Sequence, residues 1–160
     1  MPDQVSDLNV VFNVPLPAPA LLMHENPRTD AQARTVLEAR GRIEDILHGR
    51  SDRFIVIVGP CSIHDPKQGI EYAAKLAALR DEVKDKIEIV MRVYFEKPRT
   101  SVGWKGLIMD PDLDGTANLS EGLRTARKLL GEIVDLGIPT ATEFLDPITP
   151  QYIADLICWA

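Results

Sequence analysis

The chain has 160 residues, 45% of them hydrophobic and 26% charged, which is the composition of one folded domain and excludes a disordered segment. Its 24 acidic and 18 basic residues give a net charge of −6, which argues against general binding to nucleic acid or to an anionic membrane. The two cysteines, Cys61 and Cys158, form no CxxC motif, so we expect no disulfide framework and a cytoplasmic location. The sequence shows neither a secretory signal nor a membrane span.

Residues 1–28 are predicted to form an extended N-terminal arm. The prolines between Pro15 and Pro19 disfavour helix and favour polyproline II structure. Apolar residues in the same stretch, among them Phe12 and Leu22, indicate that the arm docks on a partner surface rather than moving freely. We therefore separate this arm from the body of the domain, residues 29–160.

Helices and strands are predicted to alternate along the body. Thr29 and Gln32 form a capping-box pattern at the first helix, and Asp65 followed by Pro66 is typical of a helix start. The continuous apolar run of residues 54–58 is typical of a strand buried on both faces. The predicted order is helix 29–49, strand 54–58, helix 65–83, strand 87–95, helix 118–137, strand 138–144 and helix 149–160.

This alternation predicts an α/β fold with parallel strands and right-handed crossovers. Two architectures fit the pattern: an open three-stranded sheet, or the first three βα units of a (β/α)₈ barrel, which needs about 250 residues. The last predicted helix reaches Ala160 without a glycine, a basic turn or a polar tail. We therefore expect the sequence to be an incomplete chain that stops within a helix.

The segment after the second strand is a basic island in an acidic chain. Four basic residues and one acid lie between Arg92 and Lys105, a net charge of +3, so the rest of the chain carries −9. Ligands of parallel α/β folds bind at the carboxyl ends of the strands, where this segment lies. The island is either a site for small anions or a solvated run of charge. Trp104, within the same long connection, is either a lid or a plug.

Cys61 follows the first strand and has three possible roles. It is a core thiol, a metal ligand, or a nucleophile with His64 as its base. One thiol is not a metal site, because zinc takes about four ligands. The residues alone do not decide between these roles.

Three motifs resemble the 3-deoxy-D-arabino-heptulosonate 7-phosphate (DAHP) synthase family, in the class with an N-terminal extension and feedback control by aromatic amino acids. They are Gly59-Pro-Cys-Ser-Ile-His-Asp65, Arg92-Val-Tyr-Phe-Glu-Lys-Pro-Arg-Thr100 and Gly103-Trp-Lys-Gly-Leu-Ile108. The resemblance implies a (β/α)₈ barrel that condenses phosphoenolpyruvate with erythrose 4-phosphate, the first step of the shikimate pathway. It also implies a divalent metal (Mn, Fe, Co or Zn) and a homo-oligomeric full-length protein.

The resemblance also assigns roles to residues. It makes Cys61 the metal ligand, with the remaining ligands on later strands outside this chain, so that the chain alone is expected to be inactive. Lys97 and Glu143 become the catalytic residues. Substrate binding falls to Arg92, Lys97, Pro98, Arg99, Thr100 and Lys105.

The resemblance further implies a pocket for an aromatic amino acid effector at Asp146, Pro150 and Gln151, which Asp7 of a neighbouring subunit would reach. Thr149 and Pro150 are equally a plain helix start. Two other functions stay open. One is a related phosphoenolpyruvate-dependent synthase acting on a different sugar phosphate, and the other is a non-catalytic fragment that binds anions or pairs with full-length subunits.

Overall fold

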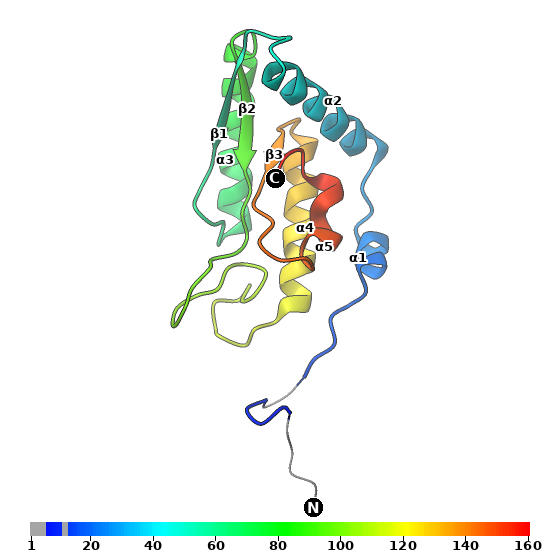
Figure 1. The fold of residues 1–160 in the computed structure, drawn as a ribbon, viewed down its shortest axis with the longest axis vertical. Coiled ribbons are helices and arrows are strands. Elements are labelled where there is room, and N and C mark those ends of the chain that lie inside the picture. The colour runs from blue at the N-terminus through cyan, green and yellow to red at the C-terminus, as the bar shows by residue number, and fades with distance from the viewer. Residues whose placement is uncertain (1–5, 11–12) are drawn as a thin grey trace, which may run out of the picture.

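A computed structural model describes residues 6–10 and 13–160. Its centre is a parallel sheet of three strands in the order β1-β2-β3, connected by helices (Figure 1). This confirms the predicted α/β alternation and the parallel pairing. The elements are α1 (Pro19–Glu25), α2 (Asp30–Leu47), β1 (Phe54–Val58), α3 (Pro66–Val83), β2 (Ile87–Arg92), α4 (Leu119–Asp135), β3 (Thr140–Ala141), α5 (Pro150–Ile153) and the 3₁₀ helix η1 (Ala154–Leu156).

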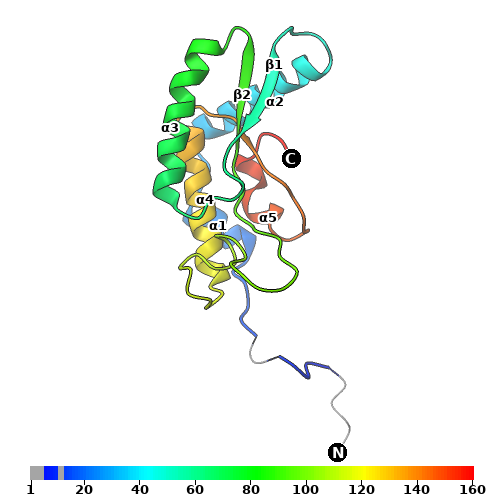
Figure 2. The same ribbon diagram turned by 90° about the vertical axis from the view of Figure 1, so that its left-hand side faces the viewer.

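Helices α3 and α4 run side by side along one face of the sheet (Figure 2). Their apolar faces and the inner face of β2 form the main core, in which Met91, Leu130 and Ile133 are fully buried. The predicted caps are present. The Thr29 hydroxyl accepts from the Gln32 backbone while the Gln32 side chain accepts from the Thr29 backbone, and Asp65 accepts from the Lys67 backbone. The helix starts were therefore readable from local sequence.

The extended form expected for residues 1–28 is wrong for part of the arm. Pro19 to Glu25 form helix α1, because Pro19 occupies the first helical position, where a missing N–H costs nothing. Leu22 is completely buried and fixes α1 to the body of the same chain, whereas docking of the arm on a partner stays a prediction. The described residues before α1 lead away from the body (Figures 1 and 2).

Strand β1 is not buried on both faces as its sequence predicted. Phe54 is 75% exposed and Ile57 55% exposed, because the described helices pack mainly on β2 and on one another and leave much of β1 uncovered. The apolar run thus predicts the strand correctly, but the described residues cover only part of its surface.

The end of the chain is also different from the prediction. Helix α5 stops at Ile153 and a 3₁₀ turn follows. Trp159 then forms a parallel bridge to Ala141, next to β3. Cys158 is buried there, where its backbone N–H donates to the Thr140 carbonyl at 2.9 Å. The chain therefore ends in an extended segment beside the sheet and not within a helix. Strand β3 is two residues long, shorter than the predicted 138–144.

Within the part of the chain that the structure describes, no helix combines the length and the apolar character that crossing a membrane requires.

Candidate functional site at the carboxyl ends of the strands

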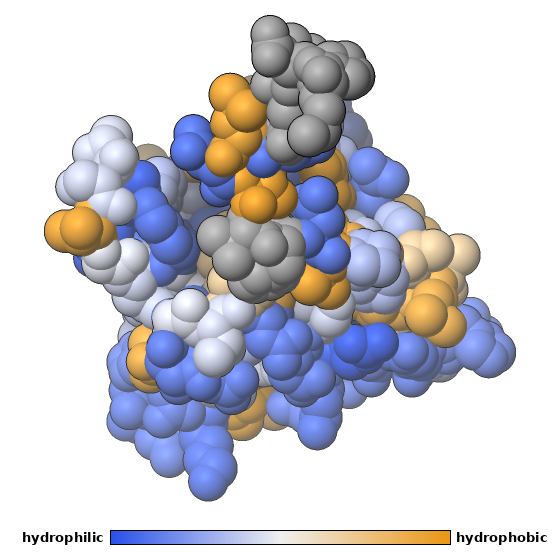
Figure 3. All heavy atoms as spheres, turned by 90° about the horizontal axis from the view of Figure 1, so that it is seen from below, coloured by the Kyte–Doolittle hydropathy of each residue, from blue (hydrophilic) through white to orange (hydrophobic). Residues whose placement is uncertain are grey.

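The carboxyl ends of the three parallel strands lie at one end of the sheet, and a chemically active residue follows or ends each of them. Cys61 follows β1, Arg92 is the last residue of β2, and Glu143 follows β3. Figure 3 shows this end of the molecule, where separate groups of hydrophobic residues lie among hydrophilic side chains. The convergence that the sequence predicted is therefore present.

Gly59 allows the connection after β1 to approach the end of β2. A Cβ atom at this position would lie 2.3 Å from the backbone oxygen of Arg92, so that only glycine fits. The close approach brings the Cys61 carbonyl to 3.3 Å from Nη2 of Arg92, which donates to it. It also lets the Ile63 N–H donate to the Tyr94 carbonyl at 2.8 Å.

Arg92 is the centre of the site. Its guanidinium forms an ion pair with Glu143 and lies over the Tyr94 ring, 4.7 Å from the ring centroid. The Arg92 side chain is 28% exposed and that of Glu143 45% exposed, so both can be reached from solvent. A guanidinium carries five N–H donors, so Arg92 can bind an anionic ligand beside Glu143 or in its place.

Lys97 contacts the cysteine. Its Nζ donates to the Sγ of Cys61 at 2.9 Å, and the exposed thiol has no other described side-chain partner. This hydrogen bond and the positive charge of Lys97, assisted by Arg92, lower the pKa of the Cys61 thiol below its ordinary value. The Cys61 thiol therefore loses its proton more readily than an ordinary cysteine does. His64 contacts the Trp104 ring edge-on instead, which gives no support to the Cys61–His64 nucleophile pair.

Two polar groups next to Arg92 are left without protein partners. The Ser62 hydroxyl and the Tyr94 hydroxyl are buried and, among the described residues, make no hydrogen bond. Burial, together with the nearby Glu96 and Glu143 carboxylates, raises the pKa of Tyr94, so its hydroxyl stays protonated. Buried unpartnered hydroxyls are uncommon, and these two follow β1 and β2 at the carboxyl end of the sheet.

The predicted substrate loop leaves the site as a short hairpin-like turn. Glu96 and Gly106 pair as an antiparallel bridge, and the Lys97 N–H donates to the Lys105 carbonyl at 2.8 Å. The Lys105 ammonium donates to the Arg99 carbonyl at 3.0 Å, which closes the turn. Pro98, Arg99 and Thr100 are exposed on it.

Trp104 is a plug rather than a lid. Its ring packs against the main core, and its Nε1 donates to the Asp110 carbonyl at 2.8 Å. The Trp104 carbonyl accepts from Nε of Arg99 at 2.9 Å, so the plug also holds the predicted substrate arginine.

Of the predicted effector residues, Asp146 lies in the turn before α5, and Pro150 and Gln151 are the first two residues of that helix. Asp146 accepts from the backbone N–H groups of Ile148 and Thr149 at 2.7 and 2.8 Å. Partial burial raises the pKa of Asp146, but these hydrogen bonds outweigh it and the pKa is lowered. Gln151 donates to the Pro147 carbonyl at 3.0 Å. A groove of about 440 Å³ separates this turn from the substrate loop, and its lining includes Leu16, Lys97, Arg99, Asp146 and Thr149.

Asp7 is not brought to this turn within the chain. The described contact of Asp7 is local, because its carbonyl accepts from the Val10 N–H. Its predicted role belongs to a neighbouring subunit and stays a prediction.

Sequence reasoning missed a hydrogen bond between the two loops. Oε1 of Glu96 accepts from Oγ1 of Thr149 at 3.0 Å, across 53 positions of sequence. The available signal was that Glu96 is the one acid within the basic island.

The metal expectation is not met by these residues alone. Among residues 6–10 and 13–160, no three His, Cys, Asp or Glu side chains gather into a cluster that could hold a metal ion. Cys61 would offer a single thiolate. The described part of the chain therefore does not form a metal centre by itself.

Comparison with known proteins places this chain in a family. The sequence profile of the DAHP synthetase I family matches residues 26–160, and the chain belongs to this family. It is 56% identical over 156 residues to the Phe-sensitive phospho-2-dehydro-3-deoxyheptonate aldolase of Escherichia coli K12, covering 98% of this chain and 45% of the relative. It is 56% identical over 144 residues to the Trp-sensitive enzyme of that strain, covering 90% of this chain and 41% of the relative.

A solved structure agrees with this assignment. The phospho-2-dehydro-3-deoxyheptonate aldolase of Francisella tularensis SCHU S4 superimposes with a TM-score of 0.91 at 50% identity, covering 94% of this chain and 44% of that one. The α/β fold is thus that of the corresponding part of a DAHP synthase, as expected for the opening units of the barrel. The chain spans less than half the length of these three relatives.

Proposed function

We propose that this chain supplies the part of a DAHP synthase active site that binds phosphoenolpyruvate, together with a loop that binds erythrose 4-phosphate. The reaction joins phosphoenolpyruvate, erythrose 4-phosphate and water to give DAHP and inorganic phosphate. The relatives are named for this product, and the observation that carries the proposal is the cluster of Arg92, Lys97 and Cys61 at the strand ends, opposite Glu143. An acidic chain concentrates its cations where two phosphate esters would meet.

The residues divide the binding work. Arg92 and Lys97 would hold the phosphate and carboxylate of phosphoenolpyruvate. On binding, the ligand would replace Glu143 as the ion-pair partner of the Arg92 guanidinium. The turn carrying Pro98, Arg99 and Thr100, closed by Lys105, would hold erythrose 4-phosphate. Fixing two anions against each other removes both their mutual repulsion and the entropy of their encounter from the barrier.

The chemical steps need one proton donor and one acceptor. The C3 carbon of phosphoenolpyruvate bonds to the aldehyde carbon, and the Lys97 ammonium would donate a proton to the aldehyde oxygen. Water then adds to C2 and loses one proton, which Glu143 would accept. The C2–O bond to phosphate breaks as the remaining hydroxyl proton passes to the leaving phosphate, which leaves the ketone at C2. Both groups lie next to Arg92 or Cys61 and within reach of the same ligand.

A divalent metal would polarise the aldehyde carbonyl as a Lewis acid. Cys61 would supply one thiolate ligand. A single ligand does not discriminate among Mn, Fe, Co and Zn as a full ligand set would. Since the described residues offer no complete site, we expect this chain alone to lack condensation activity. Measured product formation by the purified chain with added metal would contradict that expectation.

The effector site is proposed on residues other than those that bind the substrates. The relatives in Escherichia coli are named Phe-sensitive and Trp-sensitive, and we infer an aromatic amino acid effector at Asp146, Pro150 and Gln151. The arm, residues 1–28, would contact a neighbouring subunit of a homo-oligomer through Asp7. Fluorescence titration of the oligomer with each aromatic amino acid tests this.

The binding test uses calorimetry with phosphoenolpyruvate on the purified chain. Wild type should bind, inorganic phosphate should compete, and Lys97→Met should weaken binding at least about tenfold, the loss of one charge-assisted contact. Lys75→Met, the same change at an exposed position of α3, is the matched control and should stay within about twofold. Absence of binding, or equal affinity in the Lys97 variant, would contradict the proposed function.

A further inference from the structure

The hydrogen bond from Thr149 to Glu96 joins two segments that carry different parts of the proposed site. Thr149 lies directly before α5, and Glu96 lies between β2 and Lys97. The Glu96 carboxylate is partly buried, and burial raises its pKa, with the Thr149 hydroxyl opposing this effect. The carboxylate thus sits where water solvates it poorly and where one hydroxyl replaces part of that solvation.

On the loop side, Glu96 sets the path of the backbone into Lys97. Glu96 forms the bridge to Gly106, and the next residue, Lys97, closes the turn through its N–H. The Lys97 side chain then reaches Cys61. A shift of the Glu96 side chain would therefore displace the next residue, Lys97, and the ammonium that contacts the Cys61 thiol.

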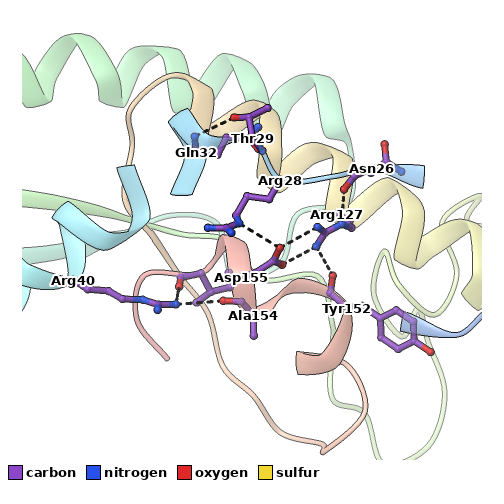
Figure 4. Close-up of polar contacts among 10 residues, drawn as sticks. Asn26, Arg28, Thr29, Gln32, Arg40, Arg127, Tyr152, Ala154 and Asp155 are labelled. Carbon is purple, nitrogen blue, oxygen red and sulfur yellow. Dashed lines mark hydrogen bonds and ion pairs between the residues drawn. The ribbon is translucent and has the colours of Figure 1, made fainter. Parts of the chain in front are cut away.

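On the helix side, Thr149 is held by a rigid base. Arg127, 1% exposed, donates to the Tyr152 carbonyl at 2.8 Å and to both Asp155 oxygens at 2.7 and 3.0 Å (Figure 4). Arg40 donates to the Ala154 carbonyl in the same view. It also donates to the Ile157 carbonyl at 2.7 Å. These bonds from α2 and α4 hold α5 and η1 in place. The Thr149 hydroxyl, at the start of α5, therefore keeps its position if the loop that carries Glu96 moves.

We propose that Thr149 and Glu96 are a positioning pair: the Thr149 hydroxyl, fixed on α5, holds the Glu96 carboxylate and thereby sets the place of Lys97 beside Cys61. Neither residue needs to touch a substrate for this role. The effect on the loop stands on the geometry alone, and the effect on ligand binding rests on the proposed function.

The test compares two variants of one side chain. Thr149→Val keeps the shape and removes the hydroxyl, whereas Thr149→Ser keeps the hydroxyl. In the purified chain, hydrogen exchange of the Lys97 N–H should be at least about tenfold faster in Thr149→Val and within about twofold of wild type in Thr149→Ser. The N–H of Ile133, in the buried core of α4, should exchange at the wild-type rate in both.

Calorimetry with phosphoenolpyruvate gives the second readout. Thr149→Val should bind at least about threefold more weakly than wild type, and Thr149→Ser should bind like wild type. An unchanged Lys97 exchange rate in Thr149→Val, equal behaviour of the two variants, or equal acceleration at Ile133 would overturn the positioning role. Altered exchange together with no binding by any variant, wild type included, would overturn the proposed function and leave the positioning pair standing.

Discussion

Replacing Arg127 by methionine should remove a buried set of polar contacts that joins α4 to the arm, to α5 and to η1. Arg127 donates to the Asn26 and Tyr152 carbonyls and makes two bonds to the Asp155 carboxylate. Breaking one side of a buried pair costs about 3–5 kcal/mol. Asp155 is 29% exposed and keeps Arg28 at 3.8 Å, so its charge is partly compensated. We therefore expect the low end, a loss of about 3 kcal/mol in the free energy of unfolding.

Urea denaturation followed by circular dichroism measures this loss. With an m-value of about 2 kcal/mol/M, the midpoint should fall by about 1.5 M without a change in slope. Lys128→Met is the matched control, because Lys128 neighbours Arg127 on α4 but is 70% exposed and pairs with Glu132 at 4.0 Å. It should cost no more than about 0.5 kcal/mol. If Arg127→Met costs less than about 1 kcal/mol, the buried-pair reasoning is refuted.

Gly122→Ala should destabilise the fold by about 3 kcal/mol in the same urea assay, because the new Cβ would lie 2.0 Å from a backbone oxygen. Gly41→Ala, with open space around it, should stabilise helix α2 by up to about 1 kcal/mol. Equal effects of the two substitutions would contradict the packing around Gly122. In metal-free buffer, iodoacetamide should alkylate Cys61 at a lower pH than an ordinary thiol requires. Lys97→Met should shift the dependence of the alkylation rate on pH to higher pH. Overlapping rate profiles of wild type and Lys97→Met would contradict the lowered pKa. The raised pKa of Glu96 means that the folded chain holds this proton more tightly, so its contribution to stability is present at acid pH and lost as the pH rises through that pKa. The stability gained by Glu96→Gln relative to wild type should therefore grow with pH in denaturation series from acid to neutral, and a constant difference would contradict the burial.

The order of the elements and the location of the site were predictable because both depend on local patterns. The Thr29–Gln32 box and the Asp65 cap mark helix starts whatever surrounds them. Parallel strands place their carboxyl ends together, so Cys61 and Arg92 had to meet once the alternation was recognised. The position of Lys97 beside Cys61, by contrast, depends on how one loop folds back, which no periodicity encodes.

The last residues show why local patterns fail near a sheet. Ile153, Leu156 and Ile157 recur at helical spacing, yet the helix ends at Ile153. Pairing with β3 takes over: the Thr140 carbonyl accepts from the Cys158 and Trp159 N–H groups, and the Thr140 hydroxyl donates to the Leu156 carbonyl. An apolar segment beside an open strand edge gains backbone partners as an extended chain, and tertiary context therefore overrides helical spacing.

Arg127 shows that one long-range contact did leave a signal in the sequence. It stands between Leu123 and Leu130 on the buried stripe of α4, where a charge is costly unless it is paired. The spacing thus requires a buried acceptor, and a carboxylate far along the chain is the natural one, but which carboxylate could not be read without the fold. The structure supplies Asp155, and with it the reason that α5 is a fixed base for Thr149. The same argument does not apply to Glu96, because it lies in a loop without periodicity, and its pairing could be found only from the coordinates.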